Sequence, residues 1–246
     1  MVVALLADIH ANLEALEACL AHAHARGAER YAFLGDLVGY GADPGAVVDV
    51  VAGHAAKGAI VVKGNHDAAI SREDGYLNEA ATAAIEWSRG VLTGGQRDFL
   101  DALPLVVHEE RACFVHASAS MPERWDYIDS PAAADRSSRA AERPYTFSGH
   151  VHDPALYGED AQGRMIAFVP QPGISIPVRP HRRWLALAGS VGQPRDGNPS
   201  ASYAIADLER GTIRFNRVPY DNLAAAAKIR AAALPEVLAY RLERGV

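Results

Sequence analysis

The stretch of sequence that decides the fold is the N-terminal run Val2-Val3-Ala4-Leu5-Leu6-Ala7, which leads directly into Asp8-Ile9-His10. An uninterrupted apolar run of this length is typical of a β-strand that is buried on both faces. The run is too short for the apolar region of a signal peptide, and no basic residues precede it. We therefore predict a buried first strand over Val2–Ala7, with Asp8 and His10 just beyond its carboxyl end.

Helices and strands alternate in the segment that follows. Asn12 is placed to cap a helix, because apolar residues then recur at helical spacing. The predicted elements are a helix to about Ala25, a strand over Tyr31–Leu34, a helix from Asp43-Pro44 to about Ala56, and a strand over Ala59–Val62. This βαβαβ order favours a mostly parallel sheet with helices outside it.

The remainder of the chain is richer in strands. Helices are expected at Leu77–Arg89, at Gln96–Ala102 and from about Asn222 to Glu243. The predicted strands are Leu105–His108, Ala112–His116, Tyr145–Ser148, Arg164–Val169, Arg183–Ala188, Ala201–Asp207 and Thr212–Val218. Two sheets packed face to face would accommodate both halves, so the predicted class is α/β (α+β): a four-layer αββα sandwich of two facing mixed β-sheets flanked by helices. No linker or repeat marks a boundary, and we predict a single domain over residues 1–246.

The composition excludes several classes of protein. The chain has 246 residues, 49% of them hydrophobic, and a formal net charge of −6, which argues against electrostatic binding of long nucleic acid or anionic membrane. Cys19 and Cys113 form no Cys-x-x-Cys pair, so no disulfide framework is implied. No apolar run is long enough to cross a membrane. We expect a cytoplasmic protein without membrane or long nucleic-acid partners, and the oligomeric state stays open.

Polar residues collect at the carboxyl ends of the predicted strands. They are Asp8, His10, Asp36, Asn65, His66, His116, His150 and His152. In open α/β sheets the ligand crevice lies outside these strand ends, so residues far apart in sequence would converge there. An isolated Asp-x-His is usually a turn or a cap, and an isolated His-x-His is usually structural or exposed. The prediction of a metal site depends on their joint appearance in this order.

The residue types suit a pair of metal ions. Carboxylate oxygens and imidazoles without sulfur favour Mn, Fe, Zn, Ni or Co over a thiolate site. The i, i+2 spacing of Asp8 and His10, and of His150 and His152, places both members of each pair on one side of an extended segment. Two divalent ions carry roughly +4, and two aspartates with a bridging hydroxide remove roughly 3, which leaves a modest positive charge suited to a phosphate ester.

This set of motifs resembles the calcineurin-like metallophosphoesterase superfamily, whose pattern is Asp-x-His, Gly-Asp, Gly-Asn-His-Asp/Glu, His and Gly-His-x-His. It is most similar to the small bacterial phosphodiesterase branch. The resemblance extends through residues 37–44 and 189–197 and covers roughly residues 1–218. The chain departs from the pattern at Ala11, where Gly is frequent, and at Leu187-Ala188, where Asn-Pro is frequent. The second departure puts in doubt a local turn or a substrate-side contact near Ser190.

The resemblance implies a role for each motif residue. One metal would be held by Asp8, His10, Asp36 and His152, and the other by Asp36, Asn65, His116 and His150, with Asp36 bridging. His66 would contact the phosphate or protonate the leaving oxygen. Asp67 would orient His66, or would instead cap the following helix.

Substrate contacts are less specific. Asn12 could reach a ligand or phosphate, or be a plain helix cap, and Arg195 could clamp a phosphate or fix its loop. Segment 117–144 has no clear strand, and a connection of that length often covers an active site. Within it, Trp125 and Tyr127 could stack on a base or aryl group, or pack in the core.

The predicted function is hydrolysis of small phosphate esters by in-line attack of a metal-bridging hydroxide, with phosphodiesters favoured and manganese the favoured metal. The metal core serves monoesters equally well, so a phosphomonoesterase or nucleotide phosphatase is the main alternative. A non-catalytic protein-binding scaffold of the same fold would be expected to lack His66 or several ligands. An aspartyl-phosphate enzyme would need a carboxylate at position 10, and a serine hydrolase a Gly-x-Ser-x-Gly elbow, which this sequence lacks.

Overall fold

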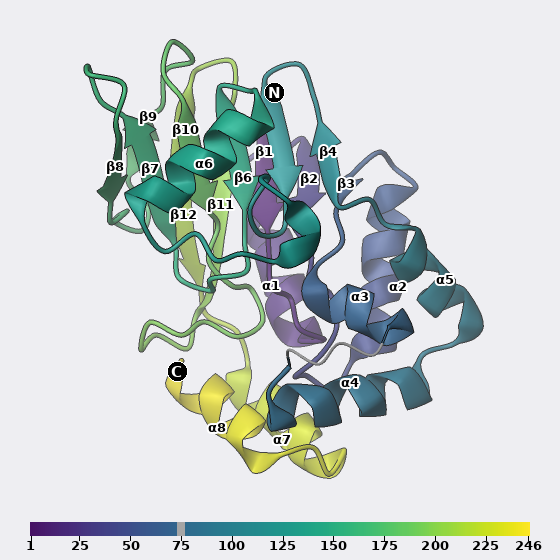
Figure 1. Cartoon of the computed structure of the whole chain (residues 1–246). Coiled ribbons are helices and arrows are strands. Elements are labelled where there is room, and N and C mark those ends of the chain that lie inside the picture. Colours follow the sequence, from purple (N-terminus) through teal and green to yellow (C-terminus); the bar gives the residue numbers. More distant parts are fainter. Residues whose placement is uncertain (73–76) are drawn as a thin grey trace.

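The computed structural model describes residues 1–72 and 77–246, and its two β-sheets lie face to face between helices (Figure 1). The first sheet has the strand order β3-β2-β1-β11-β12-β9. Its strands are β1 (Val2–Leu6), β2 (Arg30–Phe33), β3 (Ile60–Val61), β9 (Ser175–Pro177), β11 (Ala201–Asp207) and β12 (Thr212–Val218). β1, β2 and β3 run parallel, whereas β11 pairs with β1 in the antiparallel direction.

The second sheet is also mixed, with the order β4-β5-β6-β10-β7-β8. Its strands are β4 (Val106–His108), β5 (Ala112–Val115), β6 (Tyr145–Ser148), β7 (Ala155–Glu159), β8 (Met165–Phe168) and β10 (Trp184–Leu187). β5, β6 and β10 are parallel, so their carboxyl ends share one edge of the sheet.

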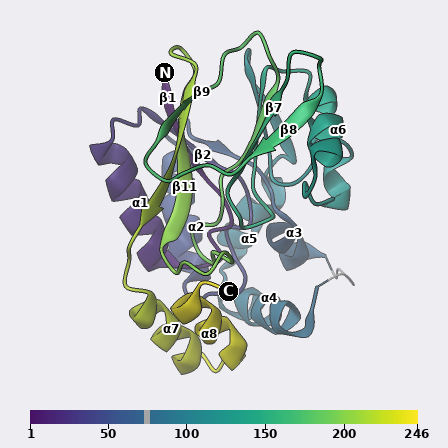
Figure 2. The same cartoon turned by 90° about the vertical axis from the view of Figure 1, so that its left-hand side faces the viewer.

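Helices cover the outer faces of both sheets. They are α1 (Leu13–Ala25), α2 (Pro44–Ala55), α3 (Asn65–Ser71), α4 (Glu79–Val91), α5 (Gly94–Ala102), α6 (Pro131–Ala141), α7 (Asn222–Ala231) and α8 (Glu236–Arg244), with a 3₁₀ turn at Pro122–Arg124. Figure 2 shows α1 and α6 on opposite outer sides of the paired sheets. The described residues thus confirm the predicted four-layer sandwich.

The alternation of side chains along β1 explains the layers. Val3 and Leu5 point into the core between the sheets, where Phe114 and Phe147 of the second sheet meet them. Ala4 and Leu6 point to the other face and pack with helix residues such as Leu16. Because successive strand side chains face opposite sides, a strand with apolar residues at every position is buried on both.

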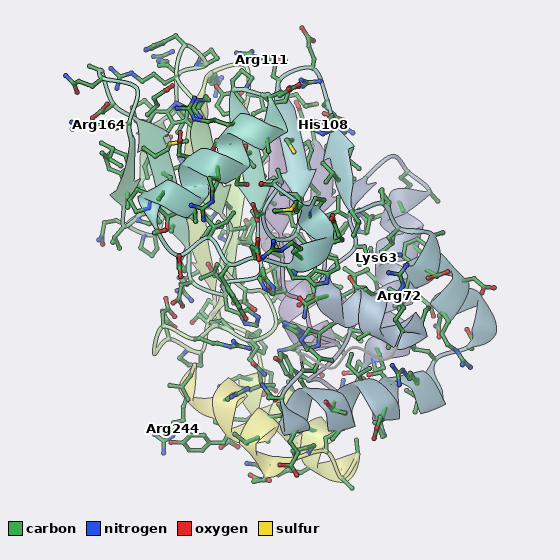
Figure 3. The ribbon with its side chains drawn as sticks, in the orientation of Figure 1. Lys63, Arg72, His108, Arg111, Arg164 and Arg244 are labelled. Atoms are coloured by element: carbon green, nitrogen blue, oxygen red, sulfur yellow. The ribbon has the colours of Figure 1, made fainter. Side chains whose placement is uncertain are left out.

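The C-terminal helices support the functional end of the molecule. α7 and α8 pack through Leu238 and Ala226 against Ala81 and Ala84 of α4 and against Tyr40. In Figure 3 the labelled Arg244 lies beside α8, at the opposite end of the molecule from Arg111 and Arg164. Throughout residues 1–72 and 77–246, none of the helices combines the length and the apolar character that crossing a membrane requires.

The sequence prediction was wrong at several elements. The terminal helix is two helices, because Pro235 has no N–H to continue the first. The prediction missed α3, which begins at Asn65 itself, and α6, which begins inside segment 117–144 with Ser130 as cap and Pro131 in the first turn. It also missed β7 and the three-residue β9.

Candidate metal centre

Hydrogen bonds between loops join the carboxyl ends of the two sets of parallel strands. The Asp8 amide donates to the Gly35 carbonyl at 3.1 Å, and the Val191 amide to the Ala7 carbonyl at 2.9 Å. In the second sheet, the Gly149 amide donates to the His116 carbonyl at 2.8 Å. The loops after β1, β2 and β10 are therefore bonded to one another, and so are those after β5 and β6. Together they carry the predicted ligands except Asn65, which begins α3.

The predicted ligands meet in overlapping clusters of buried side chains. Their potential ligand atoms lie within 4.8 Å of one another in each of three groups: Asp8, His10 and His152; Asp36, His116 and His150; and His10, Asp36 and His66. The first two groups fall within the two predicted ligand sets. Asn65 joins the second, since its Oδ1 lies 3.2 Å from His116 Nε2. The geometry is suited to divalent metal ions, and the individual ligand roles stay predictions.

Backbone carbonyls fix which imidazole nitrogens face inward. The Nδ1 atoms of His10, His116 and His152 lie 3.2, 2.7 and 2.6 Å from the carbonyl oxygens of Val38, Leu34 and Gln193 respectively. A carbonyl only accepts, so each Nδ1 carries a proton, and Nε2 is the nitrogen that faces the centre.

Those inward-facing nitrogens lie close together. His10 Nε2 is 3.1 Å from His152 Nε2, and His116 Nε2 is 3.1 Å from His150 Nδ1. Asp36 Oδ2 lies 3.4 Å from His116 Nε2 and 3.8 Å from His10 Nε2. Between His10 and His152, whose rings are neutral, the facing Nε2 lone pairs repel one another unless a cation lies among them. This donor set fits a divalent ion.

The electrostatics of the protein alone point the same way. Burial lowers the pKa of His10 and His152 well below its ordinary value, and that of His150 to about 3, so these rings are neutral and free to coordinate. Burial opposes charge on Asp36 and His116 too, but each supports the charge of the other. The pKa of Asp36 is held well below its usual range, and that of His116 is raised to about 9.

The backbone is strained where these side chains project. Asp8, His10, Asp36, His150 and His152 all have positive φ, between 49° and 70°. This left-handed conformation costs a non-glycine residue roughly 1–2 kcal/mol. It persists where surrounding contacts determine the backbone, and such residues cluster at functional sites.

The glycines of the motifs have a packing role beside the carboxylates. A Cβ at Gly149 would lie 2.7 Å from Asp8 Oδ2, and a Cβ at Gly64 would overlap Asp36 Oδ1. The Gly in Gly-His-x-His and in Gly-Asn-His is thus required by close approach to a carboxylate, independently of any turn type.

His66 lies beside the two main clusters. Its ring centroid is 4.8 Å from that of His10 and 4.6 Å from that of Tyr40. Burial lowers its pKa, and within the described residues its buried Nδ1 has no hydrogen-bond partner. Gly39 Cα stands directly against that nitrogen, because a Cβ on Gly39 would overlap it. Only a glycine at position 39 leaves room for the ring.

Asp67 is a structural residue in this geometry. Its Oδ1 accepts from the amides of Leu37 and Val38, and its Oδ2 accepts from the amide of Gly64. Asp67 is the third residue of α3, and its bond to the Gly64 amide is part of a capping box at the start of that helix. These bonds brace the loop after Asp36, and the predicted role of Asp67 in orienting His66 stays a prediction.

The Asn12 side chain also forms hydrogen bonds to other groups of the protein. Its Oδ1 accepts from the Ala15 amide, and its Nδ2 donates to the Gly192 carbonyl and the Tyr220 hydroxyl. The plain helix cap is therefore confirmed for Asn12, and its side chain is absent from the lining of the cavity described below. Ser190 braces the centre from behind, since its hydroxyl donates to the Asp8 carbonyl at 2.8 Å.

A cavity of about 600 Å³ opens over the clusters. Its floor includes Asp36, Asn65, His66, His150 and His152, and its walls include the predicted substrate contacts Arg195, Trp125 and Tyr127. The alternative that Tyr127 packs in the core is wrong, because this residue is 55% exposed. The sequence prediction missed Tyr40, Leu77 and Asn78 in the lining. The signal for Tyr40 was its place between Gly39 and Gly41, four positions after Asp36.

Arg195 occupies the wall beside Tyr40. Its Nη2 donates to the Tyr40 hydroxyl at 3.3 Å and to Gln193 Oε1 at 3.2 Å, both neutral acceptors. The neighbouring carboxylate of Asp196 pairs with Arg217 instead, and within residues 1–72 and 77–246 the buried Nε of Arg195 has no hydrogen-bond partner. Its charge thus remains available to the cavity.

Comparison with known proteins agrees with the geometry. The calcineurin-like phosphoesterase superfamily domain matches residues 1–211. The chain is 35% identical to the uncharacterized protein MJ0912 of Methanocaldococcus jannaschii, over 99% of this chain and 98% of that protein. It is 36% identical to a metallophosphoesterase from Sphaerobacter thermophilus, with a TM-score of 0.89 over 100% of this chain and 99% of that one. The protein PH1004 of Pyrococcus horikoshii, at 22% identity, shares the fold with a TM-score of 0.79 over 100% and 98% of the two chains. This chain therefore belongs to the calcineurin-like phosphoesterase superfamily.

Proposed function

We propose that this chain hydrolyses small phosphodiesters, including nucleotide esters, at a pair of divalent transition-metal ions, with manganese as the favoured metal. The observation that carries the proposal is the pairing of inward-facing imidazole nitrogens, His10 with His152 and His116 with His150, on either side of Asp36. Two such pairs flanking one carboxylate support two ions with Asp36 between them. Asp8 and Asn65 complete the two sets.

The ions, when bound, would generate a hydroxide nucleophile at neutral pH and neutralise the phosphoryl oxygens. The protein's own part is to hold the imidazole ligands in fixed orientations. The carbonyls of Val38, Leu34 and Gln193 do this by fixing the three Nδ1 protons.

His66 is the proposed proton donor to the leaving oxygen. It lines the cavity without belonging to either predicted ligand set, and Gly39 and Tyr40 fix the ring from two sides. A positioned acid of this kind typically contributes about 10²–10⁴-fold to the rate.

Arg195 is the proposed contact for non-bridging phosphate oxygens. A guanidinium with a free donor beside the centre suits a phosphate. Arg195→Gln should therefore raise KM for a phosphodiester with little change in metal content. An unchanged KM would leave Arg195 with a purely loop-fixing role.

A diester is favoured over a monoester by the resemblance to the small bacterial phosphodiesterase branch. The phosphomonoesterase alternative shares the same metal core. The test is hydrolysis of bis(p-nitrophenyl) phosphate and p-nitrophenyl phosphate by protein stripped of metal and reloaded with Mn²⁺. We expect diester turnover to exceed monoester turnover. A reversed preference would favour the monoesterase, and no turnover with Mn, Fe, Zn, Ni or Co would favour a non-catalytic scaffold.

A further inference from the structure

Two aromatic side chains stand at the cavity without belonging to the core. The Tyr127 ring stacks on the His150 ring, with centroids 4.2 Å apart and an interplanar angle of 26°. Tyr127 is nevertheless 55% exposed, so the stack leaves much of the ring uncovered. Trp125 is half-buried and meets His116 edge-on at 6.0 Å. An exposed aromatic surface beside a candidate catalytic centre is suited to a planar ligand.

The backbone around these residues is held in place. Met121 and Trp125, at the two ends of the 3₁₀ turn, both have φ of 56°. Ile128, directly after Tyr127, is buried against α6 and the second sheet, and its carbonyl accepts from the Tyr157 hydroxyl at 3.4 Å. The aromatic pair is therefore preorganised between a strained turn and a buried anchor.

The aromatic pair lies on one side of the centre. Trp125 and Tyr127 contact the rings of His116 and His150, which belong to the second predicted ligand set. Tyr40 contacts the rings of His10, His66 and His152 on the side of the first set.

Arg195 stands over the Tyr40 ring at 5.7 Å. His66 and Arg195 thus share one side of the cavity, and the aromatic pair occupies the other.

The two sides also differ in charge. Glu123 and Asp126 line the cavity beside Trp125, and Arg124 pairs with Asp126 at 3.6 Å. The aromatic side therefore carries one carboxylate in excess among these residues and disfavours a further phosphate. A neutral, flat group such as a nucleobase fits this side.

We propose that Tyr127 and Trp125 form an aromatic subsite for the ester arm that remains on the phosphorus, so that the product is the nucleoside monophosphate or aryl phosphate. The inference rests on the proposed function, because it takes His66 as the group that protonates the leaving arm. The departing alcohol then leaves on the Tyr40 side. In the reaction, a water oxygen forms the new bond to phosphorus, the bond to the leaving oxygen breaks, and that oxygen takes a proton.

The direction of cleavage tests the proposal. The methyl ester of adenosine 5′-monophosphate has one aromatic arm and two alcohols of similar leaving ability. Metal-loaded protein is expected to yield adenosine 5′-monophosphate and methanol. Adenosine and methyl phosphate as the main products would overturn it. Parallel turnover of bis(p-nitrophenyl) phosphate shows that the proposed function holds in either case.

Variants of Tyr127 test the subsite by binding. Stacking of a base on an aromatic side chain contributes about 5- to 150-fold in affinity. Tyr127→Leu should weaken binding of adenosine 5′-monophosphate by that factor in calorimetry, without weakening methyl phosphate or lowering metal content. Tyr127→Phe should keep the affinity, since the ring makes the contact. The matched control is Tyr240→Leu, an equally exposed tyrosine on α8 (50% exposed).

Two results would contradict the subsite. One is equal binding of adenosine 5′-monophosphate by Tyr127→Leu and the unsubstituted protein. The other is a loss of metal or of kcat at unchanged KM, which would show that Tyr127 only positions His150.

Discussion

His10 and His152 face each other through Nε2 atoms 3.1 Å apart, although 142 positions separate them in sequence. Each ring donates its Nδ1 proton to a backbone carbonyl, so neither proton can occupy the gap. The arrangement is costly for the protein alone and favourable around a cation. It accounts for the strained backbone at both residues, because the chain holds them where a ligand needs them.

His66→Asn should slow hydrolysis without lowering the metal content. The loss should be about 10²–10⁴-fold for an ester with a poor, alkyl leaving group. It should be much smaller for p-nitrophenyl esters, whose leaving oxygen needs little protonation. Steady-state rates on the two ester types, with metal content measured alongside, make the comparison. Full turnover of the alkyl ester by the variant would remove His66 from the acid role.

Gly39→Ala should displace His66 and lower kcat. Gly39 has a φ of +84°, which strains the backbone of any residue with a side chain, and the new Cβ would overlap His66 Nδ1. Gly58→Ala is the matched control, because Gly58 has a φ of +89° with nothing within 4 Å. Both variants should lose stability through backbone strain of roughly 1–2 kcal/mol. Only Gly39→Ala should lose activity at a temperature where both are folded, and equal activities would argue against the contact.

Ala11→Gly should stabilise the protein. Ala11 has a φ of 51°, a left-handed conformation that glycine adopts without steric cost. Glycine removes the strain but adds freedom to the unfolded chain, so we expect a net gain of up to about 1 kcal/mol. Thermal unfolding would show a higher Tm, and a lower Tm would contradict the strain.

Arg183→Gln should reduce stability at neutral pH but not in acid. Hydrogen bonds from Arg139 and Arg183 lower the pKa of Asp135, and those from Arg183 lower the pKa of Glu159. A carboxyl with a depressed folded pKa stabilises the fold above its unfolded pKa and loses that contribution as pH falls through the folded value.

The Arg183 side chain is 21% exposed, so roughly 1–2 kcal/mol is expected. Urea unfolding at pH 7 and about pH 3 should show the difference between the two proteins shrinking in acid. Arg210→Gln, at an exposed pair, serves as the control. A constant difference at both pH values would mean that Arg183 acts by packing alone.

Elements were predicted correctly from the sequence where the local residue pattern matches the environment of the element in the fold. β11 and β12 have the predicted bounds, because their apolar residues bury on the inner faces of a sandwich. α6 was missed although Ser130-Pro131 is a helix-start signal, since its buried face consists of alanine and serine and has no large apolar residues. Pro235 is a signal from which two terminal helices, in place of one, could have been predicted.

The residues of the candidate site were also predicted only in part. The motif residues were found because each follows a strand, and the carboxyl ends of parallel strands lie at the same edge of a sheet. Tyr40 and Asn78 were missed because their role depends on how α4 and the loop after β2 approach the cavity. The hydrogen bonds that Asp67 accepts from the Leu37 and Val38 amides could not be predicted, because these residues lie 30 and 29 positions away.

The metal content of the protein tests the central claim most directly. Elemental analysis of purified chain reloaded with Mn²⁺ should find two ions per chain, with turnover of bis(p-nitrophenyl) phosphate rising in step with occupancy. Asp36→Asn should reduce the metal content, because Asp36 lies between both imidazole pairs. An Asp36→Asn variant with full metal content and activity, or an unsubstituted protein that binds no divalent ion, would contradict the account.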